Sequence, residues 1–416
     1  MHASVRKLRA SSTAVRVVAL LALTLAGMVS LAPVPANAAE FSNEVGQPLK
    51  DAQAAMSKRN WDSALASIKK AQSVPTRKPA EDHAINEMLA YVLISQKKPA
   101  EAARVYEQSI DAGLTPQAKV PERQKTIAQL YAQASYYPKA IDYGNRYLKT
   151  NSADADMHWL VAQAEYQSKD CPSALLATDN AIRAARRANQ SPKLDWLRMK
   201  LVCQPKEDKR GIRDTREQMV RHFPTKQNWN DLLGTLCRSD DVHDRAKLDC
   251  YRLMLETDTL KEPDVYVEMA QIALESGMPG EAVRILEKGF SNGVLADKNK
   301  DRHTRLLNQA KEQARAIESN LAKLTAEATA DSKGGGDLQL AGAYMSVGKY
   351  DKAVESIQRS IKKGGIKHVD AAQMMLGRAY LKLNQKEQAR KAFKSVADDS
   401  QLSRVAGLWN VYAQQS

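Results

Sequence analysis

The four cysteines are the residues whose type and spacing point most directly to a chemistry. They stand at Cys171, Cys203, Cys237 and Cys250, and their spacing matches no zinc or iron–sulfur pattern. In an oxidising compartment, an even number of cysteines favours two disulfide bonds. Four cysteines allow three connectivities, so the positions of the helices that carry them must decide the pairing.

The other reactive side chains predict no catalytic site. The seven histidines are scattered and form no His-Glu-x-x-His motif. The chain has no Gly-x-Ser-x-Gly turn for a nucleophile, and no strand leads into the glycine triplet at 334–336, so a phosphate-binding loop is not expected there. We therefore expect no catalytic residue, no metal ion and no cofactor.

A recurring pair of small residues indicates the elements that position the rest of the chain. Two residues of Ala or Gly stand twelve positions apart, and successive pairs are mostly 34 to 38 residues apart. Such a spacing leaves room for one helix, a tight turn and the start of an antiparallel helix, and units stacked in this way form a helical solenoid. The nine pairs are Ala52/Ala64, Ala90/Ala102, Ala128/Ala140, Ala162/Ala174, Gly234/Ala246, Ala270/Ala282, Ala310/Ala322, Ala341/Ala353 and Gly377/Ala389.

The composition supports helices throughout. The 416 residues include only four Phe, 19 Gly and 15 Pro, whereas residues of high helix propensity dominate. No run of alternating Val, Ile or Thr is typical of a strand. We predict an all-α fold, a right-handed superhelix of antiparallel helix pairs from about residue 42 to residue 413.

Other side chains recur at fixed places around the small pairs. In the last unit, Leu376-Gly377-x-x-Tyr380 precedes Ala389-x-x-x-Phe393, and Trp61, Pro99 and Tyr137 occupy the same inter-helix turn in earlier units. These residues resemble the tetratricopeptide repeat (TPR), which implies a TPR-type solenoid of about ten repeats that binds other proteins. The family pattern ends each repeat with Pro, and we expect looser connectors because this chain has glycines there, Gly113, Gly293 and Gly364.

The pattern divides the chain into four parts. We predict a signal peptide at 1–38, N-terminal repeats at 39–190, divergent repeats at 191–330, and a C-terminal pair of repeats with a capping helix at 331–416. Within the divergent part, residues 300–330 have two interpretations: one continuous helix, or a degenerate eighth repeat that turns near Asn320. The Ala310/Ala322 pair favours the degenerate repeat, and residues 332–336 read as a hinge.

The repeat pattern also suggests how the cysteines pair. Cys171 stands where a second helix begins and Cys203 where the next first helix ends, so we predict that they lie at the same height and form a bridge. By elimination Cys237 pairs with Cys250. Taking Gly234 and Ala246 as level leaves this second pair about 10 Å apart, beyond the roughly 7 Å that a bridge tolerates. The second bridge therefore needs a local departure from the repeat, and the alternative is a pair of buried thiols.

In TPR solenoids the first helix of each repeat lines the inner surface. The position after each small residue faces this surface, and it is occupied by Gln or Tyr in several repeats and by Arg378 in the last. Amide groups between aromatic rings suit an extended peptide, although Trp159 and Trp196 have the alternative role of packing between repeats. We predict a peptide-binding surface formed by Tyr91, Gln129, Trp159, Gln163, Tyr166, Trp196 and Lys200.

The order of features extends the resemblance. Asp195-Trp196 and Asn228-Trp229 are followed by Leu286-Glu-Lys-Gly-Phe290 and later by Lys362-Lys-Gly-Gly-Ile366. This layout is similar to that of exported TPR proteins that accompany the ExbB, ExbD and TonB energy-transduction systems. The resemblance implies an accessory role in energised outer-membrane uptake, with a component of the TonB system as the partner. The alternatives are a scaffold for envelope assembly and a partner of a peptidoglycan enzyme.

The beginning of the chain is typical of a secretory signal. Arg6, Lys7, Arg9 and Arg16 precede an apolar stretch that is too short for a stable membrane anchor, and Ala36-Asn-Ala38 is a cleavage site. The mature chain keeps 58 of 62 Lys and Arg and all 48 Asp and Glu, which gives a net charge of +10. Because a periplasmic protein does not meet nucleic acid, we expect this charge to solubilise the protein.

We predict that the signal is cleaved after Ala38 and that the mature protein is periplasmic. Mass spectrometry of the purified protein should find Ala39 at the N-terminus. An intact Met1 in the membrane fraction would instead support an uncleaved anchor.

Overall fold

The structure is a computed structural model that describes residues 41–238, 242 and 244–415. The predicted signal peptide at 1–38 lies outside the described residues, so its cleavage stays a prediction. The chain forms two compact units, Met1–Ser191 and Pro192–Ser416. None of the described helices combines the length and the apolar character that crossing a membrane requires.

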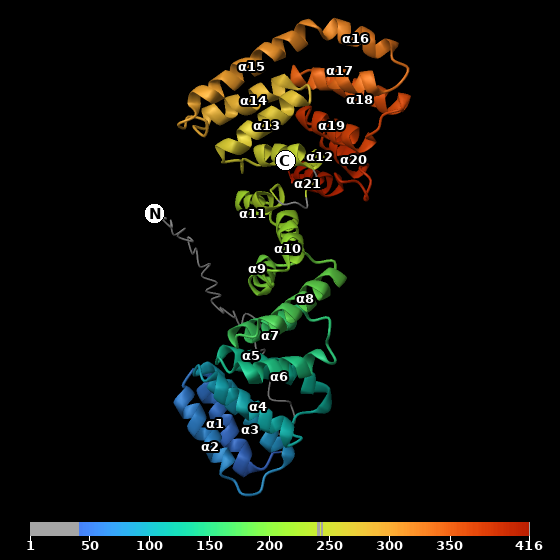
Figure 1. Ribbon diagram of the computed structural model, residues 1–416. Helices are drawn as coiled ribbons and strands as arrows, with labels where there is room; N and C mark the ends of the chain where they lie inside the picture. Colours follow the sequence, from blue (N-terminus) through green and yellow to red (C-terminus); the bar gives the residue numbers. More distant parts are fainter. Residues whose placement is uncertain (1–40, 239–241, 243, 416) are drawn as a thin grey trace. The chain divides into compact units, whose positions relative to one another are not determined.

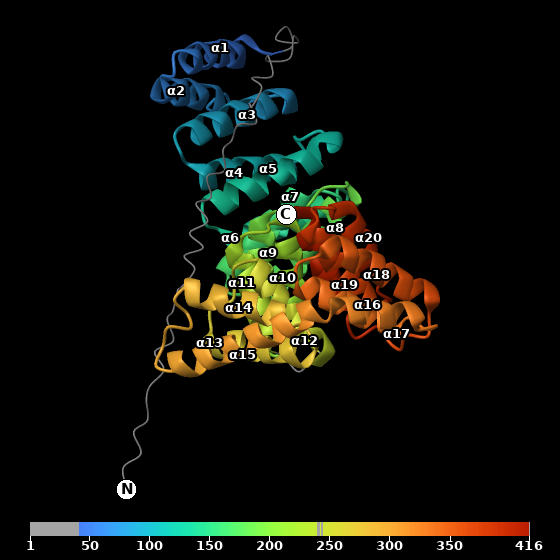
Figure 2. The ribbon, with the colours of Figure 1, turned by 90° about the horizontal axis from the view of Figure 1, so that it is seen from above.

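All regular secondary structure in the described residues is helical, which confirms the all-α prediction. In the first unit (unit 1 below), eight α-helices follow one another as antiparallel pairs, joined between the second and third pair by a short 3-10 turn at Gln117–Lys119 (Figure 1). Figure 2 shows α1 to α5 stacked in chain order. The helices are α1 (Asn43–Ser57), α2 (Trp61–Gln72), α3 (Pro79–Ser95), α4 (Pro99–Asp111), α5 (Val120–Gln133), α6 (Tyr137–Leu148), α7 (Ala155–Gln167) and α8 (Cys171–Arg187).

The small pairs of unit 1 hold its helices together as predicted. All eight alanines of the first four pairs are completely buried, because each lies where two helix backbones approach most closely. The turns within the pairs share one geometry, in which a single non-glycine residue adopts a left-handed conformation at Arg59 (φ 55°), Lys97 (φ 60°), Ser135 (φ 62°) and Lys169 (φ 65°). The repeated spacing therefore encodes a repeated turn.

The second unit (unit 2 below) contains the remaining thirteen helices of the described chain. Its helices follow one another along the chain, and α13 with α14, α17 with α18 and α19 with α20 form antiparallel pairs (Figure 1). The helices are α9 (Leu194–Cys203), α10 (Lys209–His222), α11 (Lys226–Leu236), α12 (Asp244–Glu256), α13 (Pro263–Glu275), α14 (Pro279–Ser291), α15 (Lys300–Ser319), α16 (Leu321–Ala330), α17 (Gly335–Ser346), α18 (Tyr350–Lys363), α19 (Val369–Lys382), α20 (Lys386–Lys394) and α21 (Ser403–Gln415).

The segment 300–330 does not form the degenerate repeat that the sequence favoured. α15 and α16 follow each other end to end, and Asn320 separates them, so the chain bends there without folding back (Figure 1). α15 packs on α14 and α16 packs on α17. Ala310 is completely buried, whereas Ala322 is exposed. Without a buried second alanine, no close antiparallel contact forms, and the twelve-residue spacing is coincidental here.

The predicted hinge at 332–336 is held in place by neighbouring backbone. The Gly334 N–H donates to the Gly364 carbonyl at 2.8 Å, and the Ser360 hydroxyl donates to the Gly334 carbonyl at 2.7 Å. A Cβ atom at Gly334 would lie 2.1 Å from the Ser360 carbonyl oxygen. Glycine is therefore required at this position for close approach of two backbones rather than for flexibility.

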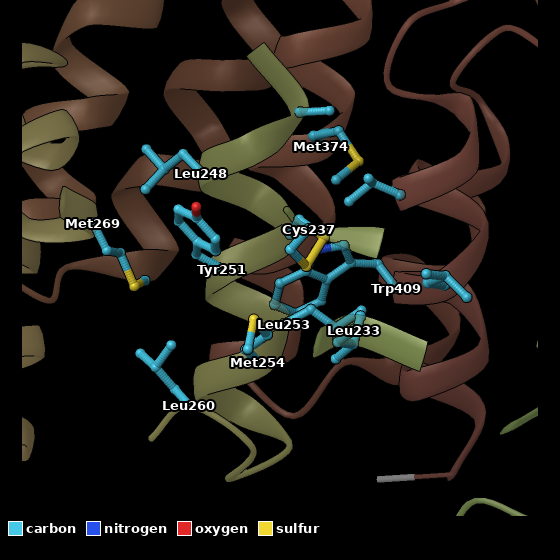
Figure 3. Close-up of a cluster of buried hydrophobic side chains, with 14 of the residues drawn as sticks. Leu233, Cys237, Leu248, Tyr251, Leu253, Met254, Leu260, Met269, Met374 and Trp409 are labelled. Carbon is cyan, nitrogen blue, oxygen red and sulfur yellow. A yellow bond between two sulfur atoms is a disulfide. The ribbon is translucent and has the colours of Figure 1, made fainter. Parts of the chain in front are cut away.

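The C-terminal helix α21 returns to the beginning of unit 2. It packs on α20 and also contacts α10 and α12. Trp409 is buried, stacks on Phe393 with ring centroids 5.7 Å apart, and donates its indole N–H to the Asp249 carbonyl at 3.0 Å. One hydrophobic core thus includes residues from Val220 to Ala413 (Figure 3). The predicted capping helix does more than cover an open end, because it closes unit 2 on itself.

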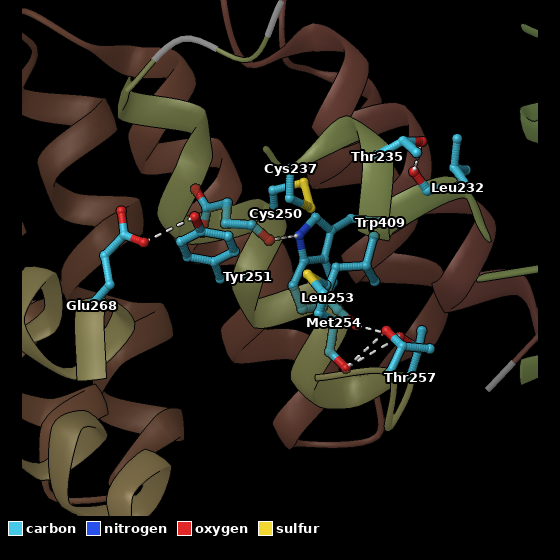
Figure 4. The surroundings of a disulfide bond; sticks show 12 residues. Leu232, Thr235, Cys237, Cys250, Tyr251, Leu253, Met254, Thr257, Glu268 and Trp409 are labelled. Carbon is cyan, nitrogen blue, oxygen red and sulfur yellow. Dashed lines mark hydrogen bonds between the residues drawn. A yellow bond between two sulfur atoms is a disulfide. The ribbon is translucent and has the colours of Figure 1, made fainter. Parts of the chain in front are cut away.

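The disulfide prediction is right for one pair and wrong for the other. Cys237 and Cys250 are bridged, with their Cα atoms 5.6 Å apart, and the bridge lies beside Trp409 (Figure 4). The local departure that this bridge needed is a connector of seven positions between the end of α11 and the start of α12. With a connector of this length, Gly234 and Ala246 need not lie at the same height, so the estimated separation of about 10 Å does not apply.

No disulfide joins Cys171 to Cys203. The prediction treated the two helices as equal in length, but α8 has 17 residues and α9 has 10. At 1.5 Å per residue this difference is about 10 Å. The first residue of α8 and the last residue of α9 are therefore not at one height, and the prediction is wrong.

Truncation of Trp409 tests the closure of unit 2. We expect Trp409→Ala to lower the free energy of unfolding by about 3–5 kcal/mol, because it leaves a large cavity in the shared core and deprives the Asp249 carbonyl of its donor. Urea unfolding followed by circular dichroism measures the effect. Val369→Ala is the control, since Val369 on α19 is 48% exposed and its truncation should cost below about 0.5 kcal/mol. Equal midpoints for the two variants would contradict the closure.

Candidate functional site

Five of the predicted peptide-binding residues lie on the first helices of unit 1. Tyr91 is on α3, Gln129 is on α5, and Trp159, Gln163 and Tyr166 are on α7. All five side chains are half-buried. The three residues of α7 are spaced by four and three positions, which places them on one face of that helix. We call these five residues the unit 1 row.

Polar contacts fix successive first helices beside one another. The Glu81 carboxylate on α3 accepts from the backbone N–H of Ser42, the N-cap of α1, at 2.7 Å. Glu87 on α3 pairs with Arg123 on α5 at 2.5 Å, and Lys125 on α5 pairs at 2.6 Å with Asp154, which caps α7. The residues of the row therefore lie on helices that are linked to one another by hydrogen bonds and ion pairs.

The unit 1 row combines aromatic rings that pack against neighbouring side chains with polar side chains that make no hydrogen bond to the described residues. The Tyr91 ring meets Trp61 edge-on with centroids 6.1 Å apart, and Trp159 packs partly on the core of unit 1. Within the described part of the chain, the side chains of Gln129, Gln163 and Tyr166 make no hydrogen bond. Their amide and hydroxyl groups are available to a ligand, while the two other rings have a fixed orientation.

The structure does not support Trp196 as an accessible peptide contact. Trp196 on α9 is only 2% exposed, and the Lys193 ammonium lies 5.3 Å from its ring centroid. The alternative role, packing in the interior, is the correct one. The prediction failed because this repeat has no small pair from which to count. Lys200, also on α9, is half-buried and belongs to unit 2, so neither residue is counted in the unit 1 row.

A second candidate site is a cavity inside unit 2 that was not among the predicted sites. It measures about 390 Å³ and lies among α12, α14, α17, α19 and α21, with Tyr350 from the start of α18 and Lys386 from the start of α20. Its charged and aromatic lining comprises Arg252, Arg284, Lys288, Arg378, Lys382, Lys386, Glu256, Glu281, Tyr350, Trp409 and Tyr412.

Four buried charges form a compact cluster at one wall of this cavity. Arg252 binds Glu281 through two nitrogen–oxygen contacts of 2.6 Å and binds Asp249 at 2.7 Å. The Arg378 Nε lies 3.2 Å from the same Asp249 oxygen, and its Nη1 lies 3.8 Å from Glu281. The cluster joins α12, α14 and α19, so it ties together helices from distant parts of unit 2.

The charges in this cluster shift one another's pKa values. Burial alone would raise the pKa of Glu281, but the neighbouring Arg252, followed by Arg378, outweighs it and lowers the pKa to about 2. Burial and the nearby Arg252 lower the pKa of Arg378. The pKa of Arg252 is raised, since Glu281 and Asp249 outweigh its burial. The Glu281 carboxylate is thus ionised at neutral pH.

One signal in the sequence pointed to this cavity. Arg378 occupies the position after the small residue Gly377, which the repeat pattern assigned to the inner surface, and it does line the cavity. The other members had no such signal, because Asp249, Arg252 and Glu281 resemble ordinary surface charges of a helix. Across the described residues, no cluster of three or more potential metal ligands forms.

The low pKa of Glu281 predicts a specific acid sensitivity. A carboxylate whose pKa is lowered on folding stabilises the protein above its unfolded pKa, near 4.5, and this contribution is lost as the pH falls towards 2. We expect Glu281→Gln to reduce the free energy of unfolding by about 3 kcal/mol at pH 6 and to have little effect near pH 2. Urea unfolding across this pH range measures the difference. Glu318→Gln, at an exposed position on α15, is the control, and a pH-independent loss in Glu281→Gln would contradict the assignment.

Comparisons with known proteins agree with the helical repeat. The family model "Tetratricopeptide repeat" matches residues 49–118 and 338–403. No curated protein sequence matches the chain significantly. Among solved structures, a tetratricopeptide repeat protein from Parabacteroides merdae is similar at 12% identity, with 90% of this chain and 100% of that chain covered and a TM-score of 0.30.

Two further structures are similar at the same low level. Naa15/Naa10 bound to HypK-THB shares 14% identity over 88% of this chain and 61% of that chain, with a TM-score of 0.38. The TPR2AB-domain:pHSP90 complex of yeast Sti1 shares 12% identity over 72% of this chain and 100% of that chain, with a TM-score of 0.23. The matched segments run from within α1 through α4 in unit 1 and from within α17 through α20 in unit 2, so these two parts of the chain are similar to the tetratricopeptide repeat.

Proposed function

We propose that this protein is a non-enzymatic scaffold whose unit 1 row binds an extended segment of another protein. The observation that carries the proposal is the open hydrogen-bonding capacity of Gln129, Gln163 and Tyr166 on adjacent first helices. A primary amide donates and accepts, so it can bond both the carbonyl and the N–H groups of an extended chain. The rings of Tyr91 and Trp159 offer apolar contact for its side chains.

The rigidity of the row supports this function. Its residues lie on helices rather than loops, and buried alanines and inter-helix ion pairs fix those helices. A surface that is already ordered loses little conformational entropy when a ligand binds. Most of the interaction energy is then available for affinity, as a scaffold that presents one surface to an extended segment requires.

We place this function in the periplasm. The predicted signal peptide supports export, and the Cys237–Cys250 bridge is consistent with an oxidising compartment. The layout resembling exported TPR proteins of the ExbB, ExbD and TonB systems makes a periplasmic segment of such a system our first candidate partner. A scaffold for envelope assembly, or a partner of a peptidoglycan enzyme, is the second candidate, because the mature chain carries a net charge of +10.

Removal of the open polar groups tests the binding surface. We expect the triple variant Gln129→Ala, Gln163→Ala and Tyr166→Ala to weaken peptide binding by tenfold or more, because contacts of this kind typically contribute about 1.4 kcal/mol or more together. Fluorescence anisotropy with overlapping peptides from the periplasmic parts of TonB and ExbD measures the affinities.

A matched triple variant controls for unrelated effects. Gln72→Ala, Gln108→Ala and Leu176→Ala remove exposed side chains from the second helices α2, α4 and α8 and should leave binding unchanged. Equal affinities for the two triple variants would show that the row is not the binding surface. Binding of no TonB or ExbD peptide would remove the first candidate partner and favour the second.

A further inference from the structure

The cavity in unit 2 has the size of a small-molecule site. Its volume of about 390 Å³ falls in the range of roughly 300–1,000 Å³ that is typical of ligand pockets. It is lined by residues from α12, α14 and α17 to α21, all within unit 2. The unit 1 row does not contribute to it, so an inference about this cavity does not rest on the proposed function.

The lining has more positive than negative charge. Six cationic and two acidic side chains line the cavity, an excess of four positive charges. Adding Asp249, which lies behind the wall and pairs with Arg252 and Arg378, still leaves an excess of three. Charges in a partly desolvated space are costly unless they are paired. The cavity therefore favours an anion.

The carboxylates of the cavity are already engaged. Glu281 is bound by Arg252, and Glu256 is bound by Lys382 at 2.6 Å. Arg284 and Lys288 instead donate to backbone carbonyls, those of Met345 and Ser346 and that of Leu255, respectively. Among the described residues, neither side chain has a carboxylate within 4 Å. Since they stand four positions apart on α14, they present two cations on one face, neither of them in a direct ion pair with a described residue.

Arg378 supplies a second, independent observation. Its side chain is 9% exposed, and its Nε has no hydrogen-bond partner, although Asp249 lies 3.2 Å away in an unfavourable direction. A buried guanidinium with an open N–H group is costly. An oxyanion in the cavity would offer this guanidinium a further hydrogen-bond acceptor.

Aromatic rings also line the cavity. Trp409 and Tyr412 pack edge to face with centroids 5.8 Å apart. The indole N–H of Trp409 is engaged by the Asp249 carbonyl, so Trp409 offers its ring rather than a donor. We propose that this cavity binds a small organic oxyanion, with its carboxylate or phosphate held by Arg284, Lys288 and Arg378 and its apolar part against Trp409 and Tyr412.

Calorimetric titration of the full mature protein with phenyl phosphate and benzoate tests the site. The control probes are phenol, which lacks the charge, and inorganic phosphate, which lacks the ring. A ligand of about eleven non-hydrogen atoms at ordinary efficiency has a Kd of about 4 mM, and we expect this affinity or better for at least one of the ringed anions. Preference for phenyl phosphate or for benzoate then distinguishes a phosphate from a carboxylate ligand.

Two charge-matched variants show where binding occurs. Lys288→Gln removes a cation from the cavity but keeps a donor for the Leu255 carbonyl, and we expect it to weaken binding about tenfold. Lys362→Gln removes the same charge from an exposed position on α18 and should leave the Kd unchanged, while circular dichroism confirms that both variants fold. The proposal is overturned if no ringed anion binds by about 10 mM, if both variants lose affinity equally, or if inorganic phosphate binds as well as phenyl phosphate.

Discussion

Close contact between helix backbones at buried small residues is the constraint on which the rest of the structure depends. In unit 1 all eight alanines of the predicted pairs are completely buried, and each larger side chain packs around those contacts. A methyl group at such a position permits close approach of two helices, which increases dispersion contacts and buried apolar area. Because each pair packs mainly on its neighbours, the same contact can be repeated along the chain.

Unit 2 uses the same contacts but adds long-range ones. The helix α21 returns to α10 and α12, and Arg404 on α21 pairs with Asp214 on α10 at 2.8 Å. Such contacts join residues about 190 positions apart, so they require the intervening helices to be in place. Packing between neighbours in the sequence therefore describes unit 1, whereas unit 2 also has a core that is shared by helices distant in the sequence.

The sequence predicted what is local and missed what is long-range. The helix pairs follow from spacings within about 40 residues, and these were read correctly wherever both small residues are buried. The failed predictions have one cause, which is that the repeat is degenerate at these places. They concern the exposed Ala322, the short α9 and the buried Trp196. The charged cluster was not predicted, because Asp249 and Arg378 lie 129 positions apart and only the position of Arg378 after Gly377 placed it on an inner surface.

The two units offer their ligands different physical environments. The unit 1 row is open to water, so its hydrogen bonds with a ligand replace hydrogen bonds with solvent and each contributes modestly. The cavity of unit 2 is lined by Trp409 and by the buried charges of Arg252, Glu281 and Arg378, and interactions between charges are stronger in such a medium. An extended chain that contacts many residues suits the first environment, because many weak contacts add up along its length. A compact anion suits the second, because a few strong contacts suffice there.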